Sequence, residues 1–154
     1  MASRSHATID GDRRVHQLLS EMADRARGVL PVWPKVGDYL AGEFTKQFDS
    51  EGAHFYSRKW KPLEPNYLRW KIKHGYDPRR LHQTGAMRDS LTSRPMAVET
   101  YSASSATFGT NDPKAKWHQN GTTNMPRRQI IRVTADLSDD VSSIIARFIF
   151  ENRL

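Results

Sequence analysis

Apolar side chains recur at steps of three and four over the first fifty residues, which predicts two helices. The first should begin near Asp10 and end before Gly28 and Pro31. Its apolar positions are Val15, Leu18, Leu19, Met22, Ala23 and Ala26. The second should begin after Pro34, and its buried side should consist of Val36, Tyr39, Leu40, Phe44 and Phe48. We expect the two helices to pair as an antiparallel hairpin or to dock separately on a sheet.

Turn-forming residues interrupt the next stretch, residues 51–83, so long regular structure is not expected there. Prolines stand at positions 62, 65 and 78, and a glycine at 75. One short helix is predicted over residues 65–74, because proline suits a first helical position and Gly75 would end the last turn. Tyr67, Leu68 and Ile72 would form its narrow apolar edge.

The pattern changes again after Gly85. Residues 91–110 are rich in Thr, Ser, Val, Tyr and Phe with a rough two-residue alternation, which predicts two antiparallel strands joined near residues 102–104. A short helix is expected over residues 114–119 and a further strand over residues 129–133. A last helix, capped by Ser138 with Asp139 and Asp140 in its first turn, should cover one face of the sheet.

These elements predict an α+β fold in a single domain over residues 1–154. Its parts would be N-terminal helices in 1–50, a long basic, aromatic-rich loop region with a short helix in 51–83, and an antiparallel β-sheet with a C-terminal helix packed on it in 84–154. The chain has 154 residues, of which 37% are apolar, so the core should be modest and the fold should lean on neighbours for stability.

Several classes of site are disfavoured by residues that are missing. The chain has no cysteine, which removes disulfides, thiolate ligands and thiol nucleophiles. No apolar run approaches the roughly 20 residues needed to cross a bilayer, and the first residues do not resemble a signal peptide, so we expect a soluble, unprocessed protein without a membrane partner.

Positive charge is concentrated in one segment. Of a formal net charge of +7, most lies between residues 57 and 80, where eight Lys and Arg face two acids and alternate with aromatic residues. Such a segment can bind phosphates and stack on exposed bases. It can equally pack Trp60, Tyr67 and Trp70 against the body or a neighbouring subunit behind a solvated rim of cations, and we favour this second interpretation.

Recognisable catalytic arrangements are lacking. The six histidines show no metal-ligand spacing, and the glycines are not grouped into a phosphate-binding loop. Asp139 and Asp140 are better explained by the positive end of a helix dipole than as metal ligands, and His82 and His118 by ordinary loop hydrogen bonds than by acid–base catalysis. We therefore expect no metal, no cofactor, no small-molecule substrate and no enzymatic activity. A nuclease or a cell-wall hydrolase is the enzymatic alternative.

Five short motifs follow one another over about residues 55–150. They are Trp60-Lys61-Pro62-Leu63 followed by Tyr67 and Lys71, then residues 81–91 around Thr84-Gly85, residues 106–111 around Phe108-Gly109, Lys116-Trp117-His118-Gln119-Asn120-Gly121, and Met125-Pro126-Arg127-Arg128. In this order the sequence resembles the phage virion-morphogenesis or tail-completion family. One departure is that members commonly carry an aromatic or aliphatic residue soon after the Pro-Arg pair, where this chain has Arg128 and Gln129.

The resemblance implies a structural virion protein, made in the host bacterial cytoplasm, that forms a ring at the head–tail neck or the head-proximal end of the tail. Tail completion, tail termination and head–tail joining all stay open, and six copies are expected by analogy with tail symmetry. Other neck and tail proteins, and the passing genome DNA, are the expected partners. The residues predicted to face an interface or DNA are Arg58, Lys59, Trp60, Lys61, Arg79, Arg80, Trp117, His118, Arg127 and Arg128. The alternative is a basic nucleic-acid-binding protein.

Overall fold

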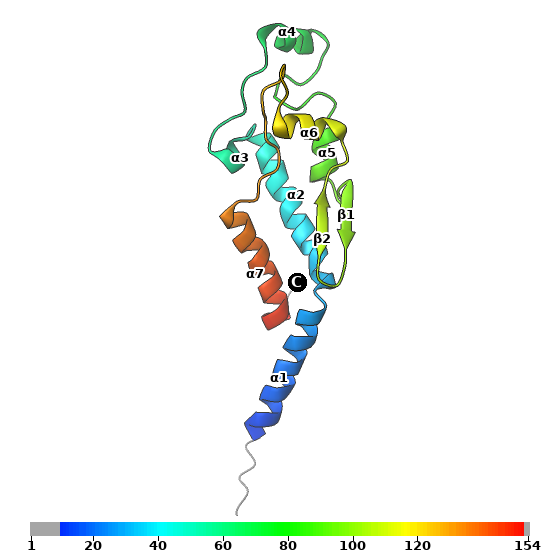
Figure 1. Ribbon diagram of the computed structural model, residues 1–154, viewed down its shortest axis with the longest axis vertical. Coiled ribbons are helices and arrows are strands. Elements are labelled where there is room, and N and C mark those ends of the chain that lie inside the picture. Colours follow the sequence, from blue (N-terminus) through cyan, green and yellow to red (C-terminus); the bar gives the residue numbers. More distant parts are fainter. Residues whose placement is uncertain (1–9, 153–154) are drawn as a thin grey trace, which may run out of the picture.

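The computed structural model describes residues 10–152, and within them the fold is α+β, as predicted, with helices at both ends and one small sheet (Figure 1). The elements in chain order are α1 (Asp10–Arg27), the 3-10 helix η1 (Leu30–Val32), α2 (Trp33–Asp49), α3 (Ala53–Tyr56), α4 (Pro65–Lys73), α5 (Ala86–Thr92), β1 (Val98–Tyr101), β2 (Ala106–Gly109), α6 (Pro113–Asn120) and α7 (Ala135–Glu151). In this part of the chain no helix has the length and apolar character that crossing a bilayer requires.

The two N-terminal helices form where the apolar spacing predicts them, but they do not pair as a hairpin. The chain breaks at Gly28, passes through η1 and enters α2, so that α1 and α2 follow one another in roughly the same direction (Figure 1). α1 packs along the end of α7 instead, where the Arg25 Nε donates a hydrogen bond of 2.8 Å to the carbonyl of Ile149. The first turns of α1 extend beyond the body of the molecule (Figure 1).

The core divides into two apolar clusters along α2. One surrounds the second half of α2, where Phe48 meets Trp60 edge to face with ring centroids 5.9 Å apart and Phe44 meets Phe55 in the same way at 6.3 Å. The other joins the start of α2 to the end of α7 through Trp33, Val36 and Phe148 among others. Edge-to-face aromatic pairs add about 0.5–1.5 kcal/mol each beyond their buried area.

A short hairpin is the whole sheet within the described residues. β1 and β2 pair antiparallel, with Val98 opposite Gly109 and Tyr101 opposite Ala106, which confirms the two predicted strands. The sequence pattern missed α5, which precedes them. This helix follows Gly85, whose φ is +85°, and it buries Met87 and Leu91 four residues apart against α2.

Residues 129–133 do not form the predicted strand, because side chains take the place of a neighbouring strand. The backbone amides of Ile130 and Ile131 donate to the Gln119 Oε1 at 2.9 and 3.0 Å, and the Gln119 Nε2 donates to the Ile131 carbonyl at 2.7 Å. The Gln129 carbonyl accepts from the Gln47 Nε2 at 3.1 Å and from the Trp60 Nε1 at 2.8 Å. Side chains therefore bind the backbone of residues 129–131, and the segment is not part of a sheet.

The last helix begins earlier than the sequence indicated. Thr134, not Ser138, caps α7, since its hydroxyl accepts a hydrogen bond of 3.1 Å from the Leu137 amide. Ser138 lies one turn inside the helix. α7 packs mainly against α1, α2 and η1, and it approaches the hairpin through the cluster that includes Phe108.

Candidate functional site

Four of the five motif segments meet around one groove of about 440 Å³, here called the motif groove. It lies at the end of the molecule that carries α4 and α6, opposite to the start of α1 (Figure 1). Its lining residues are Pro62, Leu63, Glu64, Tyr67, Leu81, Gln83, Thr84, Gly85, Met87, Asp112, Lys114, His118, Asn124, Met125, Pro126 and Arg128. Segments far apart in the sequence thus build a single concave surface with both apolar and polar walls.

A glycine turn brings the last motif back to the groove. Gly121 ends α6 with a φ of +75°, and a Cβ at this position would lie 3.0 Å from the Arg127 amide nitrogen. Thr122 and Met125 then close the turn by pairing their backbones. Only glycine allows this approach without strain, which gives the turn-forming role predicted for this position a structural basis.

Arg128 supports the wall of the motif groove by binding backbone carbonyls. Its side chain is 6% exposed, and its Nε and Nη2 donate hydrogen bonds of 3.0 Å to the carbonyls of Lys61 and Pro62. Burial lowers the pKa of this guanidinium from its ordinary value. The residue that departs from the family pattern therefore joins the first motif to the last, and its charge is not free to meet a partner.

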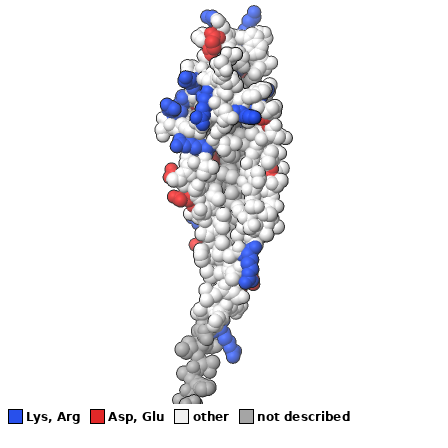
Figure 2. Space-filling view, in the orientation of Figure 1, with Lys and Arg blue, Asp and Glu red and all other residues white. Residues whose placement is uncertain are grey.

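Five of the ten residues predicted for an interface surround a second cavity, here called the basic hollow. Arg58, Lys59, Lys61 and Arg127 line it together with Tyr56, Trp60 and Gln129, and its volume is about 310 Å³. Trp60 is buried and belongs to the core, so the four cations form the accessible part. Figure 2 shows Lys and Arg side chains gathered on the upper body of the molecule.

The cations of the basic hollow are poorly neutralised. No acidic residue lines the cavity, and Lys59 reaches only the Glu51 carboxylate, at 3.7 Å. Within residues 10–152, Arg58 and Lys61 form no ion pair. A group of exposed, unpaired cations attracts anions such as phosphates or carboxylates.

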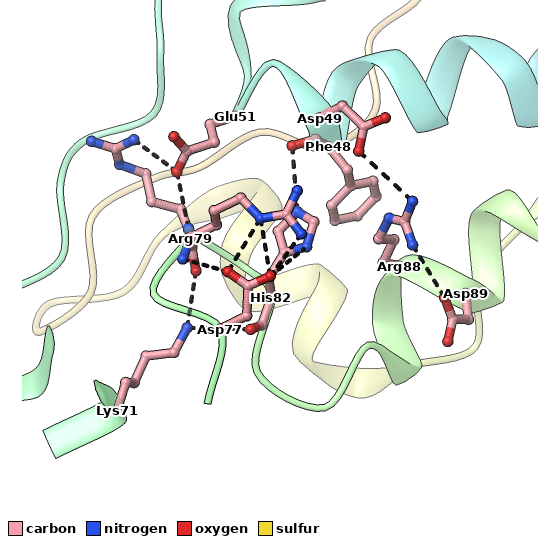
Figure 3. Close-up of polar contacts among 10 residues, drawn as sticks. Phe48, Asp49, Glu51, Lys71, Asp77, Arg79, His82, Arg88 and Asp89 are labelled. Atoms are coloured by element: carbon pink, nitrogen blue, oxygen red, sulfur yellow. Dashed lines mark hydrogen bonds and ion pairs between the residues drawn. The ribbon is translucent and has the colours of Figure 1, made fainter. Parts of the chain in front are cut away.

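Arg79 and Arg80, also predicted to face a partner, lie outside the hollow and pair within the chain (Figure 3). The Arg79 guanidinium binds the Asp77 carboxylate at 2.7 Å, and its hydrogen bonds lower the pKa of Asp77 to about 2. Arg80 binds Glu51 at 2.8 Å. Their charges are therefore largely compensated before any partner arrives.

Lys71 shows that part of the basic segment is internal. Its side chain is 2% exposed, and its Nζ donates to the carbonyls of Arg79, at 2.9 Å, and His82, at 3.4 Å (Figure 3). Burial lowers the pKa of this amine. Lys71 thus holds the loop after α4 in place, a role that its spacing in the sequence did not indicate.

Trp117 and His118 lie side by side on α6 but differ in environment. Trp117 is 51% exposed, whereas the ring of His118 contributes to the motif groove and its Nδ1 is buried without a hydrogen-bond partner. His82 is buried against Phe48 and the Phe48 carbonyl. No cluster of His, Asp or Glu able to hold a metal occurs in the described part of the chain.

Acid is expected to destabilise the protein through these two histidines. Burial lowers the pKa of His82 and of His118, with Arg79 and Arg128 adding to the effect. Because the unfolded chain takes up protons first, stability should be full above the ordinary pKa of about 6.5 and should fall as pH drops through that value. Urea unfolding of a His118→Gln variant between pH 7.5 and 5 should show a shallower decline, and His74→Gln, which changes an exposed ring, is the control. Equal slopes for the two variants would contradict this assignment.

Comparison with known proteins agrees with the motif order. No curated protein and no solved structure matches the chain. The sequence model of the phage virion morphogenesis family matches residues 10–149, which include all the segments that form the motif groove and the basic hollow. The chain belongs to the phage virion morphogenesis family.

Proposed function

We infer that the chain, as a member of the phage virion morphogenesis family, takes part in building the phage virion. Within this role, we propose that it is a structural subunit of a ring at the head–tail neck or the head-proximal end of the tail, where it completes or terminates the tail or joins it to the head. Its action is mechanical, and no bond is made or broken. After synthesis in the host cytoplasm it becomes part of the virion.

An uncovered apolar stripe on α1 carries this proposal. Val15, Leu18 and Leu19 are 53%, 49% and 56% exposed, and they belong to α1, the helix whose first turns extend beyond the body (Figure 1). A helix of a monomeric protein normally turns such a stripe toward its own core. An exposed stripe at helical spacing indicates a surface that another protein covers.

Ring assembly fits such a surface. Contacts between different patches of identical subunits close into a ring when the rotation per subunit divides a full turn. We expect sixfold closure from the symmetry of phage tails. The exposed apolar and charged side chains would then contact other copies of the chain and other neck and tail proteins.

The stripe gives the direct test of the proposal. Leu18→Glu should leave the monomer folded but weaken its assembly roughly 10- to 150-fold per contact, because burying a leucine contributes about 1.5–3 kcal/mol. Sedimentation velocity would measure assembly, and plaque titre in a complementation assay would measure function. Ser20→Glu, on the polar side of α1, should change neither. Normal particles with Leu18→Glu would refute the proposal.

The basic hollow favours one alternative function, which is nucleic-acid binding. Its four cations are accessible and largely unpaired. If DNA is the partner, the isolated chain should bind it with a slope of log affinity against log salt near −0.9 per phosphate neutralised. Lys61→Glu should weaken binding and reduce the slope, while Lys35→Glu, exposed on α2, is the control. A chain that shows no DNA binding at low salt would exclude this function.

A further inference from the structure

The α1 stripe and the motif groove are two surfaces of the described residues that stay uncovered in one copy of the chain. They lie at opposite ends, because α1 extends from one end of the molecule and the groove is built at the end that carries α4 and α6 (Figure 1). We propose that the motif groove of one copy receives the α1 stripe of the next copy. This inference rests on the proposed ring function and names the contact that would build the ring.

The spacing of the stripe suits a groove. Val15, Leu18, Leu19 and Met22 occupy positions i, i+3, i+4 and i+7, which are the anchor positions of amphipathic helices that dock in apolar grooves. A cavity of about 440 Å³ admits such side chains but not a helix about 10–12 Å across. The helix backbone would therefore lie over the mouth of the groove with its stripe pointing inward.

The lining of the groove matches this occupant. Leu63, Leu81, Met125 and Pro126 supply apolar walls, and methionine adapts its shape to an incoming side chain. Charges at the edge are also complementary. Among the accessible charged side chains that line the groove, Glu64 and Asp112 outnumber Lys114, and the exposed Arg13 and Arg14 directly precede the stripe on α1.

The positions of the stripe and the groove indicate that the occupant of the groove is a second copy of the chain and that the copies are arranged head to tail. In one copy the stripe cannot reach the groove, because the length of the body separates them (Figure 1). Pairing of stripe with stripe would give a symmetric dimer and leave the groove empty. Pairing of stripe with groove leaves one free surface of each kind until the ring closes.

Disulfide trapping tests the contact directly, since the chain has no cysteine of its own. Purified protein carrying Leu19→Cys and Met125→Cys should form a ladder of linked oligomers on oxidation, seen on a non-reducing gel. Each single variant, and the pair Ser20→Cys with Met125→Cys, should stay unlinked. Linked dimers of the Leu19→Cys single variant, or no ladder from a double variant that still assembles, would overturn the inference.

A mixing experiment tests the direction of assembly. Leu18→Glu disables the stripe and Met125→Glu the groove, so each variant alone should be monomeric by sedimentation velocity. Each still offers the other intact surface, and an equimolar mixture should therefore form one-to-one pairs with the affinity of a single wild-type contact, within about tenfold. Circular dichroism checks that both variants fold.

The outcomes separate this contact from the ring itself. If the wild-type chain assembles and enters particles but the variants neither link nor pair, the stripe–groove contact is wrong and the ring proposal stands. If the wild-type chain stays monomeric at all concentrations and is absent from particles, both are wrong.

Discussion

Replacing Gly52 with alanine is expected to lower the free energy of unfolding by about 2–5 kcal/mol. Gly52 precedes α3 with a φ of +101°, which costs an alanine about 1–2 kcal/mol. A Cβ there would also lie 2.6 Å from the Trp60 ring, and overpacking a buried ring costs about 1–3 kcal/mol more. Because Trp60 also binds the Gln129 carbonyl, its displacement would disturb the segment that directly follows the last motif.

Gly42 provides the matched control for this substitution. It lies inside α2, and a Cβ built there meets nothing within 4 Å. Gly42→Ala should therefore stabilise the protein by about 0.5–1 kcal/mol through helix propensity. Urea unfolding followed by circular dichroism would compare the two variants, and a Gly52→Ala variant as stable as the wild type would show that the Trp60 contact is not restrictive.

Gln119→Leu should lower the free energy of unfolding by about 2–4 kcal/mol. The side chain makes three hydrogen bonds to the backbone of Ile130 and Ile131, and leucine would leave those buried groups unsatisfied. Gln119→Glu should cost less, since a carboxylate keeps the two accepted bonds and loses only the donated one.

Equilibrium unfolding against an exposed glutamine would measure this effect. Gln17 on α1 bonds only to the neighbouring Glu21, at 3.0 Å, so Gln17→Leu should change stability by less than about 0.5 kcal/mol. If Gln119→Leu were equally mild, the packing of Ile130 and the hydrogen bonds of Gln47 and Trp60 to the Gln129 carbonyl would suffice to hold the segment 129–131.

The sequence predicted the elements whose start and end are determined by residues within them or next to them. α1 follows from its apolar spacing and Gly28, α4 from Pro65 and Gly75, and the end of α6 from Gly121. In each case the side chains that decide the element lie within it or next to it. Local signals of this kind do not depend on the rest of the fold.

Elements decided by distant contacts were missed. α5 is only seven residues long and forms because Met87 and Leu91 pack on α2. Residues 129–133 contain three β-branched residues, as a strand often does, but Gln119 and Trp60 bind their backbone. Similarly, nothing in the sequence near Lys71 indicated that two carbonyls of a later loop would surround its amine.

The candidate site was predicted in part. The sequence drew attention to the basic segment, and Arg58, Lys59, Lys61 and Arg127 do surround one hollow. It gave no reason to separate Arg79 and Arg80, whose acids Asp77 and Glu51 become partners only after folding. Motif order indicated a family, but the groove where the motifs meet is a property of the folded chain.

The side-chain support of residues 129–131 has a consequence for how this protein can vary. Gln47, Trp60 and Gln119 recognise main-chain atoms, which every amino acid except proline presents alike. Position 129 can therefore vary in residue type while the backbone keeps the same path, and the selective constraint falls on three supporting side chains outside the segment. In an alignment of relatives, those three residues would then be a better guide than the segment itself. They would identify the point at which the chain leaves the motif groove and runs toward α7.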